Sequence, residues 1–281
     1  DAYVPALLKE IELQQSYLEK EPIETIYIGG GTPSLLNYTQ LSSILEKLNK
    51  TFEIKLDAEI TIEANPNDLS ANKIKDFKNL FINRLSIGIQ SFFEEDLKYL
   101  HRLHTSSQAE TAVKRSQDAG FENISIDLIY GIPTLSDENW EKNLHYSFSL
   151  YVPHISAYSL TVEPHTALNK LITKGKLTPV NEEQSINHFK ALMQQTREND
   201  FLHYEVSNFC KKDYFSKHNS NYWKGVKYLG LGPSAHSYNK AERQWNISDT
   251  QKYIEHLDLN KLLYEKEVLS ETDKLNEYIM T

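Results

Sequence analysis

Three consecutive glycines follow a short apolar run near the start of the chain, in the segment YIGGGTPS at residues 27–34. Glycine loses more conformational entropy on folding than any other residue, so three together need a compensating role. A backbone that must approach a ligand closely supplies such a role, and so does a tight turn with positive φ. We interpret the run as a ligand contact and keep a plain turn as the alternative.

Polar side chains stand at or near the ends of several other apolar runs. Carboxylates there can accept hydrogen bonds from hydroxyl groups, and amides can both donate and accept. Each residue taken alone also has an ordinary structural explanation, as a helix cap, a surface acid or a satisfied interior group. These residues are Glu63, Asn65, Gln90, Asp127, Tyr158 and Ser159.

The apolar runs alternate with amphipathic segments, and this alternation predicts βα units. Strands and helices in alternation are typical of a parallel sheet, in a barrel or an open doubly wound fold. Both folds bind ligands at the carboxyl ends of their strands, so we expect the glycines and the polar residues to form one composite site. The expected strands are Thr25–Ile28, Glu59–Ile62, Leu85–Ile89, Ile124–Ile129, Ile155–Leu160 and, more weakly, Leu202–Val206.

The composition is that of an ordinary globular protein, with 40% hydrophobic and 25% charged residues among 281. The net charge of −9 gives no positive field to attract nucleic acid. No apolar run reaches the roughly 20 residues that span a bilayer, so we expect a cytoplasmic protein without a transmembrane segment. A single cysteine, Cys210, allows no intrachain disulfide and fits a reducing compartment.

Six segments in order, GGGTPS, IEANP, RLSIGIQSF, LHRLHT, ISIDLIYGIP and HISAYSL, are more informative together. They resemble the radical S-adenosylmethionine (SAM) enzymes of the oxygen-independent coproporphyrinogen III oxidase family. The resemblance implies an α/β fold, a partial (β/α)6-type TIM-like barrel with an extra C-terminal segment. It implies a barrel lacking its first strand over residues 1–200, the barrel end with an HNxxYW segment over 201–269, and the start of a truncated C-terminal helical domain over 270–281.

The same resemblance implies roles in SAM binding. The exposed backbone of the glycine run would contact the SAM amino group, and Glu63 would accept hydrogen bonds from the ribose hydroxyls. Arg102 would pair with the SAM carboxylate through its planar guanidinium, and Ala157 would lie near the adenine. The complete set is Gly29, Gly30, Gly31, Thr32, Glu63, Gln90, Arg102, Asp127 and Ala157.

The family's chemistry also needs a 4Fe-4S cluster on three thiolates in a C-x3-C-x2-C motif. Ligation of such a cluster needs several cysteines close together, and this chain has only Cys210. In the family the motif follows the first barrel strand, so we expect a truncated chain, with natural loss of the cluster as the alternative. We interpret Cys210 as a small, partly buried thiol that binds no metal.

Residues 218–223 read HNSNYW and resemble the HNxxYW motif of the HemW branch, which is thought to insert haem into client proteins. Imidazole is a good ligand for haem iron and aromatic side chains can pack on a porphyrin, so His218, Tyr222 and Trp223 are candidate haem contacts. A purely structural cluster is the alternative. His236 is a second candidate ligand, whereas we interpret His101 and His104 as helix surface rather than a metal pair.

The sequence leaves three functions open. The first is a haem chaperone that binds SAM and haem, with haem-receiving client proteins and an electron donor as partners. The second is an oxygen-independent coproporphyrinogen III dehydrogenase, which decarboxylates the propionates of a porphyrinogen. The third is a nucleotide- or SAM-binding protein without a cluster. A single cysteine cannot hold the cluster that radical chemistry needs, so we leave open whether this chain is an enzyme.

Overall fold

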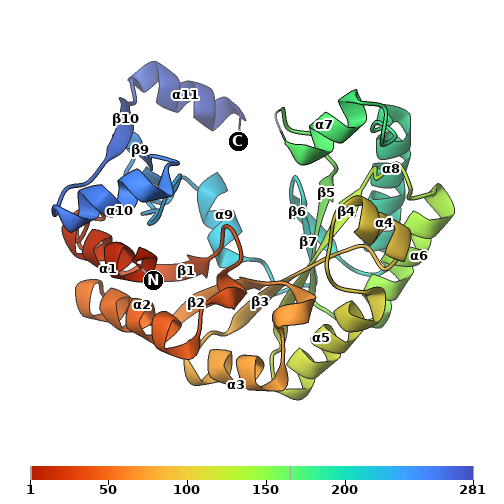
Figure 1. Cartoon of the computed structure of the whole chain (residues 1–281), viewed down its shortest axis with the longest axis horizontal. Coiled ribbons are helices and arrows are strands. Elements are labelled where there is room, and N and C mark those ends of the chain that lie inside the picture. The colour runs from red at the N-terminus through yellow and green to blue at the C-terminus, as the bar shows by residue number, and fades with distance from the viewer. Residues whose placement is uncertain (1, 165, 281) are drawn as a thin grey trace. The chain divides into compact units, whose positions relative to one another are not determined.

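The computed structural model describes residues 2–164 and 166–280 (Figure 1). Its contacts divide the chain into two compact units, which are described separately. Unit 1 contains residues 1–26, 36–59 and 216–281, and unit 2 contains residues 27–35 and 60–215. The boundaries expected near residues 200 and 269 stay predictions, and residues 1 and 281 lie outside the described part.

Unit 2 contains most of a seven-stranded sheet, whose strand order is β1-β2-β3-β4-β5-β7-β6. The pairs β2–β3, β3–β4 and β4–β5 are parallel, as expected for a half-barrel. Helices α3, α5, α6 and α8 cover the outer face of this curved sheet (Figure 1). The strands are β1 (Ile23–Ile28), β2 (Ile54–Ala64), β3 (Arg84–Gln90), β4 (Asn123–Tyr130), β5 (His154–Ser159), β6 (Leu202–Glu205) and β7 (Asn208–Cys210).

Short helices and longer covering helices connect these strands. Several begin at a residue whose side chain accepts a hydrogen bond from the first turn, such as Thr105 before α5 and Ser136 before α6. The helical elements are η1 (Pro33–Leu35), η2 (Pro66–Asp68), α3 (Ala71–Asn79), α4 (Glu94–Tyr99), α5 (Ser106–Asp118), α6 (Asp137–Ser149), α7 (Ala167–Thr173) and α8 (Glu182–Glu198).

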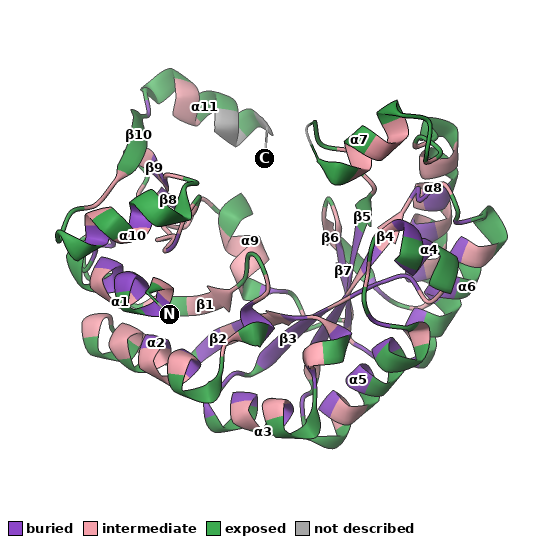
Figure 2. Cartoon of the chain, viewed as in Figure 1, coloured by how far each residue is buried: buried purple, intermediate pink, exposed green. Residues whose placement is uncertain are grey.

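Side chains alternate strictly along the central strands of unit 2. In β3, Leu85 and Ile87 are fully buried, while Ser86 and Gly88 face the other way and line a pocket. In β4 the same pattern separates Ile126 from Asp127. Figure 2 shows these strands as mostly buried under helices with exposed outer faces. The period of two therefore gives the sheet an apolar helix-covered face and a polar inner face.

The end of the sheet differs from the expected simple succession of strands. The run Leu202–Val206 does form a strand, β6, but β6 does not pair with β5. Instead β7 pairs antiparallel with both β5 and β6. A hairpin after β6 places β7 between them, and antiparallel neighbours need only such a short connection.

Unit 1 combines helices with a second sheet of three strands, in the order β10-β9-β8. One core cluster joins Val4, Leu7, Ile11 and Ile44 from α1 and α2. The elements are α1 (Tyr3–Leu13), α2 (Tyr38–Thr51), α9 (Lys217–Trp223), β8 (His236–Tyr238), β9 (Glu242–Asn246), α10 (Thr250–Asp258), β10 (Tyr264–Val268) and α11 (Glu271–Met280).

Glu10 of α1 is a buried carboxylate that holds three parts of unit 1 together. It accepts hydrogen bonds from the Gly232 N–H at 2.7 Å, from the Tyr253 hydroxyl at 2.6 Å and from the Asn246 amide at 2.5 Å. Burial raises the pKa of this carboxyl, and the three donors oppose that rise. Because the donors come from a loop, β9 and α10, the single carboxylate fixes all three.

Among the described residues, no helix is both long enough and apolar enough to cross a membrane.

Candidate functional site

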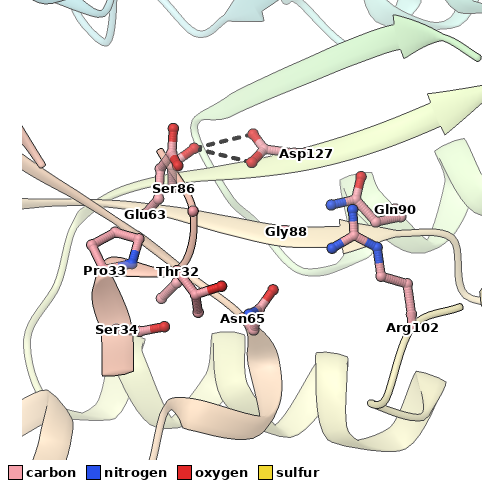
Figure 3. A pocket seen from close by; sticks show the side chains of 12 residues that line it. Thr32, Pro33, Ser34, Glu63, Asn65, Ser86, Gly88, Gln90, Arg102 and Asp127 are labelled. Atoms are coloured by element: carbon pink, nitrogen blue, oxygen red, sulfur yellow. Dashed lines mark hydrogen bonds between the residues drawn. The ribbon is translucent and has the colours of Figure 1, made fainter. Parts of the chain in front are cut away.

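A polar pocket opens at the carboxyl ends of the parallel strands of unit 2 (Figure 3). This is the edge where the ligand sites of barrel and doubly wound folds lie. Five separate segments supply its walls, namely the glycine turn, the end of β2, the length of β3, the loop that carries Arg102, and β4. The lining residues are Gly31, Thr32, Pro33, Ser34, Glu63, Ala64, Asn65, Ser86, Gly88, Gln90, Arg102 and Asp127.

The glycine run forms a turn that only glycine adopts without strain. Gly30 and Gly31 have φ values of +78° and +63°, in the left-handed region. A Cβ atom at Gly30 or Gly31 would meet no atom within 4 Å, so this backbone is open on that side. A Cβ at Gly29 would instead lie 2.5 Å from the Tyr27 ring and 2.8 Å from Glu63 Oε1. Positive φ and close packing therefore both require glycine here.

Glu63 ties the glycine turn to the end of β2. Its Oε2 accepts a hydrogen bond from the Gly30 N–H at 3.1 Å, and its Oε1 accepts one from the Tyr27 hydroxyl at 2.8 Å. A carboxylate has about four acceptor positions, so two bonds leave capacity for hydroxyl groups of a ligand. Burial raises the pKa of the Tyr27 hydroxyl and the Glu63 charge raises it further, so Tyr27 stays a donor.

Asp127 is a second carboxylate of the pocket and lies on β4. The Ser86 hydroxyl donates to its two oxygens at 3.1 and 3.3 Å (Figure 3). Loss of solvent raises the pKa of Asp127 to about 6, and the Ser86 hydrogen bond limits that rise. The Glu63 charge raises it further. The pocket thus holds two carboxylates in different environments.

Gln90 and Arg102 form the opposite side of the pocket (Figure 3). Gln90 ends β3 with a φ of +71°, at a point where the register with β4 shifts. Such a backbone conformation is costly for a residue other than glycine and is typical of functional sites. Burial lowers the pKa of the Arg102 guanidinium and the Asp127 charge opposes this. Within the described residues, no carboxylate lies within ion-pair distance of Arg102.

The structure brings most of the expected SAM residues together. Gly31, Thr32, Glu63, Gln90, Arg102 and Asp127 all line the pocket, and Gly30 bonds to Glu63. Ala157 does not line the pocket, because it is buried in β5 beside Leu128 of the neighbouring strand. Tyr158 and Ser159 do not line it either.

The lining residues Ser86 and Gly88 were missed in the sequence. Both share the inner face of β3 with Gln90, at every second position of RLSIGIQ. The alternation of leucine and isoleucine with small or polar residues was therefore the signal that could have found them.

The HNxxYW segment forms a short helix, α9, in unit 1. Ser216 caps it by accepting a hydrogen bond from the Asn219 N–H at 3.2 Å. The buried carboxylate of Glu59 accepts two more, from the N–H groups of Lys217 and His218, each at 3.0 Å. A carboxylate at this end satisfies otherwise unpaired N–H groups and complements the helix dipole.

Both ring nitrogens of His218 have a hydroxyl neighbour. Its Nδ1 lies 2.9 Å from Thr25 Oγ1, and its Nε2 lies 3.0 Å from the Tyr222 hydroxyl. Tyr222 also packs edge-on against Tyr228, with ring centroids 4.9 Å apart. Tyr222 and Trp223 keep 48% and 43% of their surface exposed, so this aromatic group is open to a ligand.

His236 lies in a separate open pocket of unit 1, on the three-stranded sheet. Its ring stacks on Trp245 of β9, with centroids 6.0 Å apart, and the Trp245 N–H donates to Glu265 at 3.2 Å. This pocket offers an aromatic surface, a carboxylate and an imidazole.

The described residues do not fit a 4Fe-4S cluster. They contain no group of three histidine, cysteine, aspartate or glutamate residues placed to hold a metal ion. Cys210 is fully buried in β7, and burial raises its thiol pKa to about 12, which disfavours the thiolate that iron requires. We expected a partly buried thiol, and the structure shows a fully buried one.

The interpretation of His104 as helix surface was wrong. His104 lies in the loop between α4 and α5 and is 3% exposed. Its Nε2 is 3.0 Å from the Ile89 carbonyl oxygen, so the residue anchors the loop that carries Arg102 to the end of β3. A buried, bonded imidazole of this kind is a structural element.

Comparison with known proteins identifies the family. The profile of the radical SAM superfamily matches residues 3–146. The chain is 37% identical over 277 residues to the protein of Lactococcus lactis subsp. lactis (strain IL1403) named heme chaperone HemW, covering 99% of this chain and 72% of the relative. It is 36% identical over 256 residues to the Bacillus subtilis (strain 168) protein of the same name, covering 91% and 68%.

An Escherichia coli (strain K12) protein, also named heme chaperone HemW, is 36% identical to the chain over 238 residues. The chain spans 61% of the length of that relative. Among solved structures, coproporphyrinogen III oxidase (HemN) of Escherichia coli superposes with a TM-score of 0.86 at 21% identity, over 99% of this chain and 67% of that one. This likeness confirms the radical SAM fold. The chain therefore belongs to the radical SAM superfamily and, within it, to the HemW family.

Proposed function

We propose that this chain is the SAM-binding and haem-binding part of a haem chaperone. The observation that carries the proposal is the 37% identity over 277 residues to a protein named heme chaperone HemW. The HNxxYW segment supports it, because it is folded as a capped helix with exposed aromatic side chains.

The pocket of unit 2 has the groups that SAM requires. The Glu63 carboxylate has free acceptor capacity for two ribose hydroxyls, and the backbone of Gly30 and Gly31 is open to a ligand. The Arg102 guanidinium has no carboxylate partner among the described residues and fits the SAM carboxylate. In this family, bound SAM is the source of a deoxyadenosyl radical.

No radical step is assigned to this chain. The residues present cannot ligate the 4Fe-4S cluster that cleaves SAM, since Cys210 is the only cysteine. The proposal for the chain itself is therefore binding of SAM and of haem. Transfer of haem to a client protein and reduction by an electron donor are proposals for the whole protein.

Haem is the cargo in this proposal, and His218 is its ligand. Neutral imidazole is a common iron ligand, and the exposed rings of Tyr222 and Trp223 can pack against a porphyrin face. His236 is the second candidate, because its ring stacks on Trp245 in an open pocket.

An anaerobic haemin titration followed in the Soret band tests the proposal. We expect saturable binding that His218→Ala abolishes and His236→Ala leaves unchanged. The reverse pattern would move the site to the pocket beside Trp245. Binding that neither substitution affects would contradict both candidate ligands, and the chaperone assignment would then depend on the relatives alone.

Oxygen-independent coproporphyrinogen III dehydrogenase is the competing function. Its support is the HemN structure, which at 21% identity shares the fold and carries no further argument about activity. Anaerobic turnover of coproporphyrinogen III by the whole protein would establish that function and overturn the chaperone proposal.

A further inference from the structure

His218 is held from both sides by hydroxyl groups in this structure. Thr25 Oγ1 lies 2.9 Å from Nδ1, and the Tyr222 hydroxyl lies 3.0 Å from Nε2. A neutral imidazole carries one N–H and one lone pair, so one hydroxyl must accept and the other must donate. The nitrogen that ligates a metal is set by the hydrogen bond that the other nitrogen makes.

The two hydroxyl groups differ as donors. A phenol is far more acidic than an aliphatic alcohol, so the Tyr222 hydroxyl is the better donor to an imidazole lone pair. The Thr25 hydroxyl oxygen then accepts a hydrogen bond from the N–H at Nδ1, in the role that oxygen acceptors play beside ligating histidines. This arrangement leaves the lone pair of Nε2 directed toward the hydroxyl of Tyr222.

We propose that Tyr222 masks the ligating nitrogen of His218 in the ligand-free chain, and that Thr25 is the positioning residue that keeps this nitrogen deprotonated. The proposal rests on the proposed haem site. Iron takes the place of the Tyr222 hydroxyl at Nε2 when haem binds, and no other bond of the imidazole has to change.

The surroundings allow Tyr222 to move while His218 stays in place. The backbone N–H of His218 is bonded to Glu59 at 3.0 Å, so the imidazole is anchored at its main chain as well as at Nδ1. Tyr222 is 48% exposed and its nearest ring partner is Tyr228, at a centroid distance of 4.9 Å. Rotation of an exposed side chain is a fast motion, so unmasking requires no change of fold.

The tautomer of His218 can be read without haem. Two-bond ¹H–¹⁵N correlation spectra of the ligand-free chain distinguish the tautomers, and comparison with His218→Gln identifies the signals among the 10 histidines. We expect the proton on Nδ1, and we expect Thr25→Val to move the population toward a proton on Nε2. A proton on Nε2 in the unsubstituted chain would overturn the proposal, because Nε2 would then donate to the Tyr222 hydroxyl and have no lone pair for it to mask.

Haemin titration provides the second readout. Tyr222→Phe keeps the ring and removes the competing hydroxyl, so we expect haemin to bind about 3 to 10 times more tightly, the value of one hydrogen bond. Thr25→Val should weaken binding about 10-fold, as loss of a partner behind a ligating histidine does. Tyr238→Phe is the matched control, because Tyr238 packs on the other partner of Tyr222, Tyr228, with ring centroids 6.0 Å apart, and we expect no change.

The outcomes separate this proposal from the proposed function. Binding that depends on His218 but is unchanged or weakened in Tyr222→Phe would overturn the masking and leave the haem site intact. Absence of His218-dependent binding in every variant would overturn the haem site and the masking with it.

Discussion

Glu59 of β2 holds the backbone N–H of His218 at 3.0 Å, although 159 residues separate the two along the chain. The same carboxylate accepts the N–H of Lys217 at 3.0 Å, so it fixes the first turn of the helix that carries the candidate haem ligand. Position and capping of α9 thus depend on a residue far outside the HNxxYW motif.

Replacement of Glu59 should therefore loosen α9. Glu59→Ala leaves two N–H groups without their acceptor, and we expect the free energy of unfolding to fall by about 1–3 kcal/mol. Haemin affinity should fall as well if His218 is the ligand. Urea unfolding followed by circular dichroism measures the first effect. Glu59→Gln keeps one oxygen acceptor, so its free energy of unfolding should lie between those of the parent and of Glu59→Ala. An alanine variant as stable as the parent would contradict the capping role.

Glu63→Gln should weaken SAM binding. The substitution removes the charge that strengthens hydrogen bonds from ribose hydroxyls, at a cost of about 1–3 kcal/mol in binding free energy. Isothermal titration of SAM against the chain measures this. Glu138→Gln, at an exposed position of α6, serves as the control for loss of a carboxylate. Equal SAM affinity in the Glu63 and Glu138 variants would argue against the ribose contact.

Neighbouring glycines should respond differently to alanine. Gly30→Ala meets open space but forces a φ of +78°, so we expect a loss of about 1 kcal/mol in stability from backbone strain alone. Gly29→Ala brings a Cβ within 2.5 Å of the Tyr27 ring, and we expect a larger loss with displacement of Tyr27. Thermal unfolding of the two variants tests this order. A Gly30 variant less stable than the Gly29 variant would contradict the observed packing.

Asp127 should make stability depend on pH. Its folded-state pKa of about 6 lies above the usual value of about 3.9, so the folded chain holds the proton more tightly than the unfolded chain. The stability that this proton supplies is complete below about pH 3.9 and is lost as the pH rises through about 6. At pH 7 we expect Asp127→Asn to raise the free energy of unfolding by about 2 kcal/mol.

Urea unfolding of Asp127→Asn between pH 4 and pH 7 is the measurement. The difference from the parent should shrink toward pH 4. Asp118→Asn, at the exposed end of α5, is the matched control and should show no such trend. A constant difference across the range would show that Asp127 does not titrate as described.

The strands of the half-barrel could be predicted from sequence because their signal is local. Leu85–Ile89 and Ile124–Ile129 carry leucine or isoleucine at nearly every second position, and the structure places β3 and β4 there with one further residue at each end. The position of the pocket followed from the strand ends. In both cases burial on the helix-covered face dictates the residue types.

The three-stranded sheet could not be predicted in this way. β10 reads YEKEV and is exposed along its whole length, and β9 reads ERQWN, so neither strand has an apolar alternation. The partners of His218 were equally hidden, since Thr25 and Glu59 come from distant strands. Such contacts join segments that are far apart in the sequence, and a local sequence pattern does not indicate which distant segments will meet.

Unit 1 is assembled from separate stretches of chain, and this sets an order of events during synthesis. Unit 2 is almost continuous, since residues 60–215 supply most of it, and a continuous segment can fold as it leaves the ribosome. The hydrogen bond between the Glu10 carboxylate and the Gly232 N–H can form only after a further 222 residues have been synthesised. Helix α1 thus emerges early but acquires its buried hydrogen bonds only after residue 232, so we expect unit 1, with α9 in it, to complete its folding after the polar pocket of unit 2.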